Sequence, residues 1–136
     1  MVPNSIRVPV SSELVFPLGA MFHSVEPVID FEARKAGTAD PQERDKQSGM
    51  RVWQVKVFDL DPEAGKFGGS AEVKVKIAAD YQPIPPAAQV PGFPPKVAFT
   101  NMTVTPYVNS KTGRLAWSVR AEDIVAFDAV ADQVAA

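Results

Sequence analysis

Two stretches in the middle of the chain alternate apolar and polar side chains with a period of two, and they constrain the fold more than any other feature. Residues 51–58 have the sequence RVWQVKVF, and residues 72–77 have the sequence EVKVKI. Positions i and i+2 share a face in a strand but lie on opposite sides of a helix. The pattern therefore predicts two strands, and the turn-forming residues 59–69 between them predict a hairpin.

Weaker alternation elsewhere predicts the remaining strands. Residues 97–108 and 114–121 flank a tight loop and form a second expected hairpin, with Pro106 at an edge position or a bulge. Residues 20–31 predict a further strand, edged or interrupted by Pro27, and residues 6–10 a short one. We therefore expect an all-β fold: a small OB-like barrel or sandwich of about five to six antiparallel strands.

The connecting segments differ sharply in composition. Residues 32–49 are charged and lack periodicity, which predicts a long exposed loop, whereas residues 82–95 are dominated by proline and predict an extended strap. Residues 125–136 are rich in alanine and predict either a short C-terminal helix or a flexible tail. The chain is thus expected to form one β-rich domain over residues 1–124, followed by that tail.

Composition limits the function classes. The 136 residues include no cysteine, which excludes disulfides and thiolate chemistry, and no apolar run approaches the ~18 residues that span a bilayer. The first residues lack the basic start and apolar stretch of a signal peptide. These features predict a cytoplasmic protein without membrane contact, and the net charge of −2 argues against a polyanion binder that acts by bulk charge.

No motif in the chain predicts catalysis, a metal or a cofactor. His23 is the only histidine and is expected to be structural or exposed, and no serine lies in a nucleophile motif. The acidic run at 59–63 begins like a calcium loop but lacks the later glycine and glutamate, so ordinary turn chemistry is favoured. Residues 65–70 lack the order of a phosphate-binding loop and are interpreted as a hairpin tip. We therefore expect a non-enzymatic protein.

The outward side of the predicted strands carries the remaining signal. If strand phasing turns Trp53, Val55, Val57, Val73, Val75, Ile77, Leu115, Trp117 and Val119 inward, the opposite side collects basic and aromatic residues: Lys56, Phe58, Lys74, Lys76, Tyr107, Arg114 and Arg120, with Gln54 and Ser118. Glu72 is its only acid. Such a face suits nucleic acid, because cations neutralise phosphates and aromatic rings stack on bases. Equally, lysine and arginine can simply solvate a sheet and discourage edge pairing.

Several ordered segments resemble a known family. These are VFPLG (15–19), VEPVIDFE (25–32), VWQVKVFDLDPEA (52–64), VKIAADYQPIPP (75–86), VAFTNMTVTPYV (97–108) and RLAWSVRAEDI (114–124). They resemble the actinomycete plasmid replication, integration and excision activators encoded on integrative and conjugative elements. The last block is also similar, more distantly, to helicase-processivity proteins of conjugative elements. The resemblance implies a role in the replication, excision or transfer of a mobile element, and no catalytic residues come with it.

Together these observations predict a DNA-binding accessory factor. Single-stranded or duplex DNA would meet the basic and aromatic strand face, and the loop carrying Arg34, Lys35, Arg44 and Lys46 would fold over it. A replication initiator, a helicase or a second copy of the chain are further candidate partners. The alternative is a protein-interaction adaptor that docks through the proline strap, or a transcriptional activator without direct base readout, because no helix-turn-helix is evident.

Overall fold

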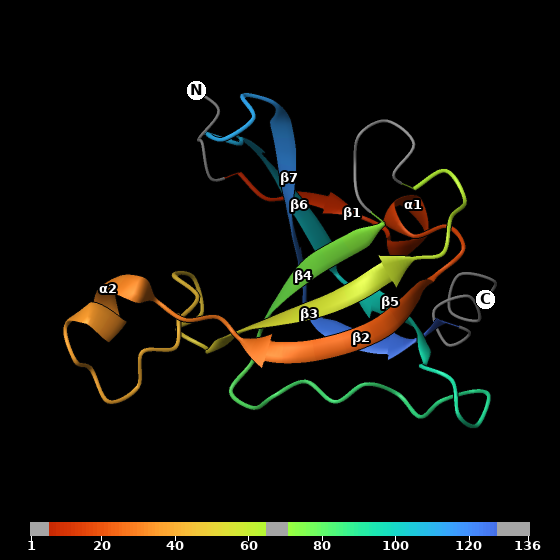
Figure 1. Ribbon diagram of the computed structural model, residues 1–136, viewed down its shortest axis with the longest axis horizontal. Helices are drawn as coiled ribbons and strands as arrows, with labels where there is room; N and C mark the ends of the chain where they lie inside the picture. Colours follow the sequence, from red (N-terminus) through yellow and green to blue (C-terminus); the bar gives the residue numbers. More distant parts are fainter. Residues whose placement is uncertain (1–5, 65–70, 128–136) are drawn as a thin grey trace.

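A computed structural model describes residues 6–64 and 71–127. Strands dominate it, with two short helices (Figure 1). In chain order the elements are β1 (Val8–Val10), α1 (Ser12–Val15), β2 (Ala20–Pro27), α2 (Phe31–Lys35), β3 (Val52–Asp59), β4 (Glu72–Ala78), β5 (Lys96–Thr100), β6 (Met102–Val108), β7 (Leu115–Ala121) and β8 (Asp123–Ala126). The all-β expectation is confirmed.

All eight strands belong to one sheet, in the order β1-β6-β7-β4-β3-β2-β5-β8. Strands β2, β3 and β4 form an antiparallel meander, and β3 and β4 are the hairpin that the alternation predicts. Among the strands of residues 6–64 and 71–127, the parallel contact joins β4 to β7. In this order the meander lies between β7 on one side and β5 on the other. Both strands belong to the C-terminal hairpin, whose two arms are β5–β6 and β7–β8.

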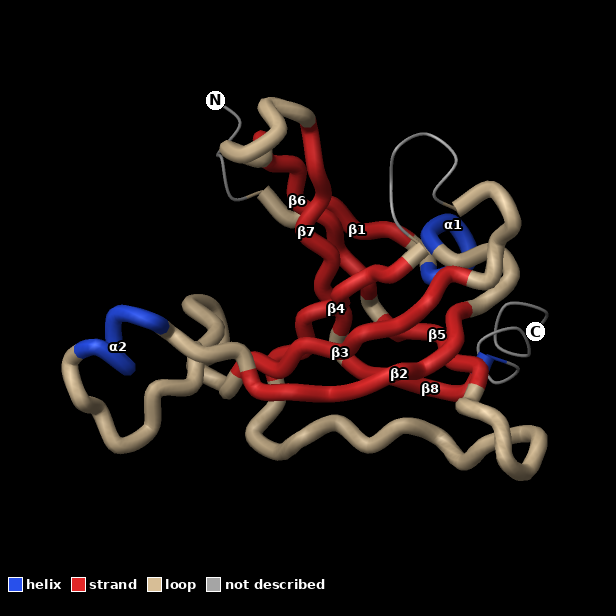
Figure 2. Tube along the Cα trace, viewed as in Figure 1, coloured by secondary structure: helices blue, strands red, loops and turns tan. Residues whose placement is uncertain are grey.

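That hairpin is long and sharply bent. Strands β5 and β6 are separated only by Asn101, whose φ of 47° is left-handed, and β7 and β8 only by Glu122. The Asn101 amide donates a hydrogen bond to the Glu122 carboxylate across the bend. One half of the hairpin pairs with β2 through β5, and the other half pairs with β4 through β7. Because both edges of the meander meet the same hairpin, the sheet curls into a half-barrel (Figure 2).

Apolar side chains from the concave side of the sheet fill the half-barrel. The buried cluster consists of Phe16, Ala20, Val55, Val57, Val75, Ile77, Val97, Phe99, Met102, Ala121 and Ile124. Helix α1 closes one end, because Phe16 packs on Phe99 with ring centroids 5.8 Å apart and the Ser12 hydroxyl accepts the Phe99 amide at 3.1 Å. Fully burying each such side chain contributes about 1.5–3 kcal/mol.

The secondary structure differs from the sequence-based expectations in three places. Eight strands replace the expected five to six, since the bend divides each arm of the C-terminal hairpin into two strands. The charged segment after β2 contains helix α2, begun by Asp30, whose carboxylate accepts the amides of Glu32 and Ala33. The domain also extends past residue 124, because β8 continues to Ala126 and pairs with β5. Residues 128–136 of the predicted tail lie outside the described residues.

A candidate nucleic-acid interface

An open groove of 1910 Å³ lies on the outer side of the sheet, and three parts of the fold enclose it. Its floor is formed by β3 and β4. One wall is the segment of residues 28–51, here called the arm, and the other is the β6–β7 hairpin. Figure 2 shows the arm and this hairpin extending away from the curled sheet. The arm is a 24-residue connection between two paired strands, so the meander positions it at the edge of the floor.

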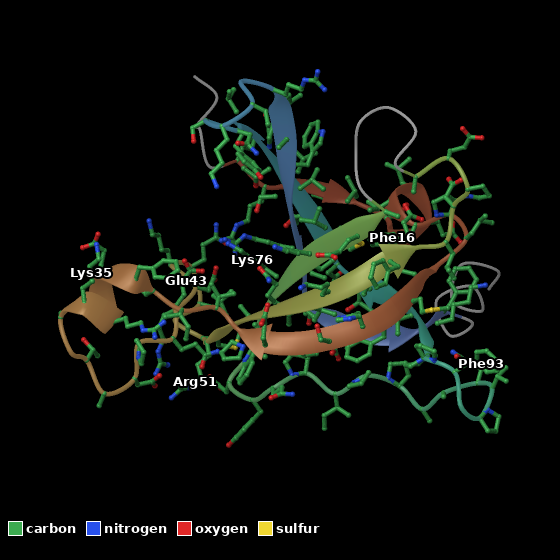
Figure 3. All side chains as sticks on the ribbon, viewed as in Figure 1. Phe16, Lys35, Glu43, Arg51, Lys76 and Phe93 are labelled. Atoms are coloured by element: carbon green, nitrogen blue, oxygen red, sulfur yellow. The ribbon has the colours of Figure 1, made fainter. Side chains whose placement is uncertain are left out.

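Two lysines of β4 stand on the floor. Lys74 is exposed and Lys76 is half-buried, and both line the groove. The register sets Lys76 beside Gln54 of β3 and Arg120 of β7, which brings three polar side chains into one row across the sheet. Figure 3 shows Lys76 on the side of β4 that faces the arm. Neither lysine has a carboxylate within ion-pair distance among the described residues, so both ammonium groups are available to an anion.

Asp45 ties the arm to the body of the protein. Its side chain is almost completely buried, and its carboxylate lies 2.9 Å from the Arg7 guanidinium and 3.5 Å from that of Arg120. The amide and hydroxyl of Ser48 each donate to it at 3.0 Å. Burial by itself raises the pKa of Asp45, but the hydrogen bonds from Arg7 and Ser48 outweigh it and hold the pKa below its usual value. The ionised Asp45 carboxylate is therefore the form that attaches the arm to the body of the protein.

The outer part of the arm is held by exposed ion pairs. Asp40 contacts the guanidinium of Arg51 and lies 3.6 Å from that of Arg44, and the hydrogen bond from Arg51 is the main reason why the pKa of Asp40 is lowered. A bridge between Ile29 and Gln42 closes the base of this region. The charged composition of residues 32–49 thus produces an ordered extension rather than the plain loop expected from the sequence.

The second wall carries aromatic rings. Tyr107 and Trp117 both line the groove, and about half of each side chain is exposed. Tyr107 pairs with Ala116, so it shares the face of Arg120, whereas Trp117 lies on the other face of the hairpin. The sequence-based prediction that Leu115 and Trp117 point into the core is wrong, because 63% and 53% of their surfaces are exposed. Alternation predicts which residues share a side of a strand, but the outer half of this hairpin projects beyond the strands that would cover it. Pro106 is the available sequence signal: it lies opposite Trp117, and proline marks a strand without a partner on one side.

The groove gathers only part of the predicted binding face. Four of the nine proposed site residues line it: Lys74, Lys76, Tyr107 and Arg120. The other five lie outside its lining: Lys56, Phe58, Arg114, Arg34 and Lys35. Lys56 is 3.8 Å from the Glu72 carboxylate, and the rings of Phe58 and His23 form a T-shaped pair with centroids 5.5 Å apart. Figure 3 shows Lys35 at the outer end of the arm.

The charge of the groove is mixed rather than strongly basic. The cations that line it are Arg7, Arg44, Lys46, Lys74, Lys76 and Arg120, and the carboxylates are Asp30, Asp40, Glu43, Asp45 and Glu72. The three arginines are engaged by Asp40 and Asp45. Lys46, Lys74 and Lys76 form no ion pair within the described part of the chain, so these three lysines supply the groove's free positive charge.

The other sequence motifs behave as turn or surface features. Asp59 and Asp61 each accept the amide two residues later, at 3.0 Å, as expected for turn residues. The Nδ1 atom of His23 is 3.0 Å from the Ser24 hydroxyl. Within residues 6–64 and 71–127, no three histidine or acidic side chains are grouped as metal ligands, and no helix has the length and apolarity needed to cross a membrane. The predicted hairpin tip at residues 65–70 lies outside the described residues.

Comparison with known proteins returned no match to a family model, to a curated protein or to a solved structure. The resemblance to mobile-element activators stays a prediction from the sequence.

Proposed function

We propose that this protein is a non-enzymatic accessory factor that binds single-stranded DNA in the groove between the arm and the β6–β7 hairpin. The observation that carries the proposal is the combination of unpaired Lys74 and Lys76 on the floor with the half-exposed ring of Tyr107 on the same side of the sheet, and with Trp117 on the other face of the hairpin wall. Ammonium groups neutralise phosphates, and each ring offers a stacking surface for a base.

Strand connectivity supports an OB-like barrel as the framework of this site. When the bent hairpin is counted as two long strands, the sheet runs from β2 through β3 and β4 to β7, and then through β6 and β5 back to β2. In OB folds the face of the second and third strands, with the loops after the first and fourth, binds oligonucleotides. The corresponding parts here are β3, β4, the arm and the turn of the C-terminal hairpin.

The charge of the groove favours a single strand over a duplex. A protein that binds duplex DNA without sequence preference depends on many phosphate contacts, and this groove offers three unpaired lysines. Two aromatic rings add the stacking energy that only unpaired bases can accept, about 1–3 kcal/mol per base. A role in the replication or transfer of a mobile element, where single strands arise, agrees with the family resemblance of the sequence.

Fluorescence anisotropy with a labelled oligothymidine and its duplex, measured over a range of NaCl concentrations, tests the proposal. The single strand is expected to bind more tightly than the duplex, with a slope of log K against log salt of about −2, because three lysines each contribute roughly 0.7. Trp117→Ala is expected to weaken binding by about 1–3 kcal/mol. Absence of binding at low salt, or binding without salt dependence, would refute the proposal.

A matched set of lysine variants locates the site. Lys76→Ala removes a cation from the groove floor, whereas Lys35→Ala removes one from the outer end of the arm, outside the groove. The first is expected to weaken binding several-fold and to reduce the salt slope by about 0.7, and the second to leave both unchanged. Equal losses in the two variants would show diffuse attraction instead of binding in the groove.

A further inference from the structure

Two cations stand side by side on the outer face of the sheet, at the point where β4 and β7 pair. Lys76 and Arg120 are register partners in this parallel contact, so their side chains project from the same face, and both line the groove. Like charges on neighbouring strands repel each other, and an anion bound between them removes the repulsion. The pair therefore favours a bound anion at this point of the groove.

The residues that flank the pair do not supply that anion. Gln54 of β3 lies next to Lys76, and its amide donates to the Glu26 carboxylate at 3.1 Å, so this acid is held one strand further away. Thr103 of β6 borders the pair on the other side and is uncharged. Glu43 of the arm lines the groove (Figure 3), but among the described residues it makes no ion pair with either cation.

Asp45 of the arm approaches the pair, but other groups occupy its oxygens. Its Oδ1 atom accepts a hydrogen bond from Arg7 at 2.9 Å, and its Oδ2 atom accepts the amide and the hydroxyl of Ser48 at 3.0 Å. Arg120 lies 3.5 Å from Oδ1, beyond the roughly 2.7–2.9 Å of a hydrogen bond between charged groups. Asp45 thus shares one negative charge between two guanidinium groups and leaves Lys76 uncompensated.

The Arg120 guanidinium is short of hydrogen-bond acceptors. Its side chain is only 26% exposed, yet none of its N–H groups makes a hydrogen bond within residues 6–64 and 71–127. No side-chain nitrogen in that part of the chain is both inaccessible and unpartnered, so the donors of Arg120 are reachable from the groove that it lines. A guanidinium fork in this situation suits an oxyanion that accepts two parallel hydrogen bonds, as a phosphate group does.

Charge and position select the kind of phosphate. Arg7, Arg120 and Lys76 face one carboxylate, so two positive charges remain. A phosphodiester carries a single negative charge, whereas a phosphomonoester carries about −1.5 to −2 at neutral pH. The contact between Asp45 and Arg120 also joins the arm to β7, so the two walls of the groove meet here. A strand end can reach the pair at this junction, whereas a continuous strand that passed between the walls would have to break the contact.

We propose that Lys76 and Arg120 bind the terminal phosphomonoester of single-stranded DNA. The Arg120 fork binds two phosphate oxygens, the Lys76 ammonium contacts the phosphate from β4, and the following nucleotides continue past Lys74. Asp45 and Arg7 position the Arg120 guanidinium without filling its hydrogen-bonding capacity. This inference rests on the function proposed above and adds which part of the strand the groove recognises.

Oligothymidines of about ten nucleotides, a length within the range that one OB fold binds, provide the test on the full-length chain. One carries a 5′-phosphate, one a 3′-phosphate, and each is compared by fluorescence anisotropy with a hydroxyl-ended strand that has its fluorophore at the same position. At least one phosphorylated strand is expected to bind about tenfold more tightly than its hydroxyl counterpart, because charged hydrogen bonds are added at the end.

Two lysines of β4 form a matched pair of variants, since both line the groove and neither is ion-paired in the described part of the chain. Lys76→Gln is expected to reduce the preference for the phosphorylated strand to less than about twofold, whereas Lys74→Gln weakens both strands equally and keeps the preference. Arg120→Lys retains a charge beside Asp45 but removes the fork, so it should also lower the preference. Thermal melting verifies that the variants fold.

The inference is overturned if either substitution in the pair leaves the preference unchanged, or if Lys74→Gln abolishes it as Lys76→Gln does. Binding of the hydroxyl strand without any phosphate preference would overturn it and leave the function proposed above intact, whereas absence of binding by every strand would overturn both. Thymidine monophosphate distinguishes the source of the phosphate. If it binds as tightly as the phosphorylated strand, the pair is a mononucleotide site and not a site for a strand end.

Discussion

The two long connections of this fold are the arm and the proline-rich connection between β4 and β5, residues 79–95, called the strap, and they become ordered by different physical means. The arm is rich in charge and is held by the carboxylates of Asp40 and Asp45, which contact arginines inside and outside the arm. The strap is rich in proline and uses its own backbone restrictions, with hydrogen bonds only near its ends. One connection depends on ionised side chains, and the other does not.

The way in which the arm is held suits the function proposed for the groove. A wall attached by ion pairs borders a groove that is proposed to receive a phosphate backbone, and Arg120 belongs both to that groove and to the contact with Asp45. The strap, in contrast, keeps its extended path through the φ angles that its prolines preset, without ion pairs. The following predictions test the distinction, beginning with the largest expected effect.

Asp45→Ala should release the arm. The change leaves Arg7, Arg120 and Ser48 without their shared acceptor at a nearly buried position, so the free energy of unfolding should fall by about 2 kcal/mol in urea titrations. Amide exchange should accelerate across residues 42–51 and stay unchanged in the strap. Asp40→Ala is the matched control, and its smaller expected effect reflects an exposed ion pair. Equal effects of the two variants would contradict the assignment of Asp45 as the main attachment.

Gln89→Ala should loosen the C-terminal end of the strap only. It removes both hydrogen bonds with the backbone of Lys96, and a loss of about 1–2 kcal/mol in the free energy of unfolding is expected, because each bond contributes roughly 0.5–1.5 kcal/mol. Exchange of the Lys96 amide should accelerate, and amides of the arm should keep their rates. Gln82→Ala, in the same strap, serves as the control. Unchanged protection of Lys96 would mean that proline sterics alone hold this end.

Acid should affect the arm and spare the strap. The folded-state pKa values of Asp40 and Asp45 lie below the usual carboxyl value of 3.8, so their stabilisation is complete above that pH and is lost as the pH falls through the lower folded values. The amides of Ser48 and Lys96 are matched reporters, since each donates to a side-chain oxygen at 3.0 Å. In NMR spectra from pH 6 to 2, the Ser48 amide should shift and the Lys96 amide should not. A common midpoint would indicate global unfolding instead.

The sequence predicted correctly those features that depend on neighbouring residues, and it failed for features that depend on residues far apart in the chain. Alternation in residues 51–58 and 72–77 correctly predicts β3 and β4, because a period of two is a property of the strand itself. The same pattern fails for Trp117, whose exposure depends on whether another strand covers the end of its hairpin. Helix α2 is missed because a single turn of helix begun by Asp30 gives no periodic signal.

The candidate site divides along the same line. Lys74, Lys76 and Tyr107 belong to outward positions that strand phasing predicts, and all three line the groove. Lys56 shares that phase, yet its neighbour Glu72 lies within ion-pair distance, and Lys35 is carried to the outer end of the arm. The alternation of a strand predicts on which side a residue lies. Whether that residue lines the groove depends on how the sheet curls and where its connections run.

The amino-acid sequence alone determined the β-rich class, the phase of the central strands and the extended strap, since each follows from steric preferences that act over a few residues. Tertiary structure decided which outward residues meet. The bend at Asn101 and Glu122 lets one hairpin join both edges of the meander, and Asp45 brings the arm to Arg120 across the groove. These contacts join residues far apart in the chain, and their free energy exists only after the sheet has curled.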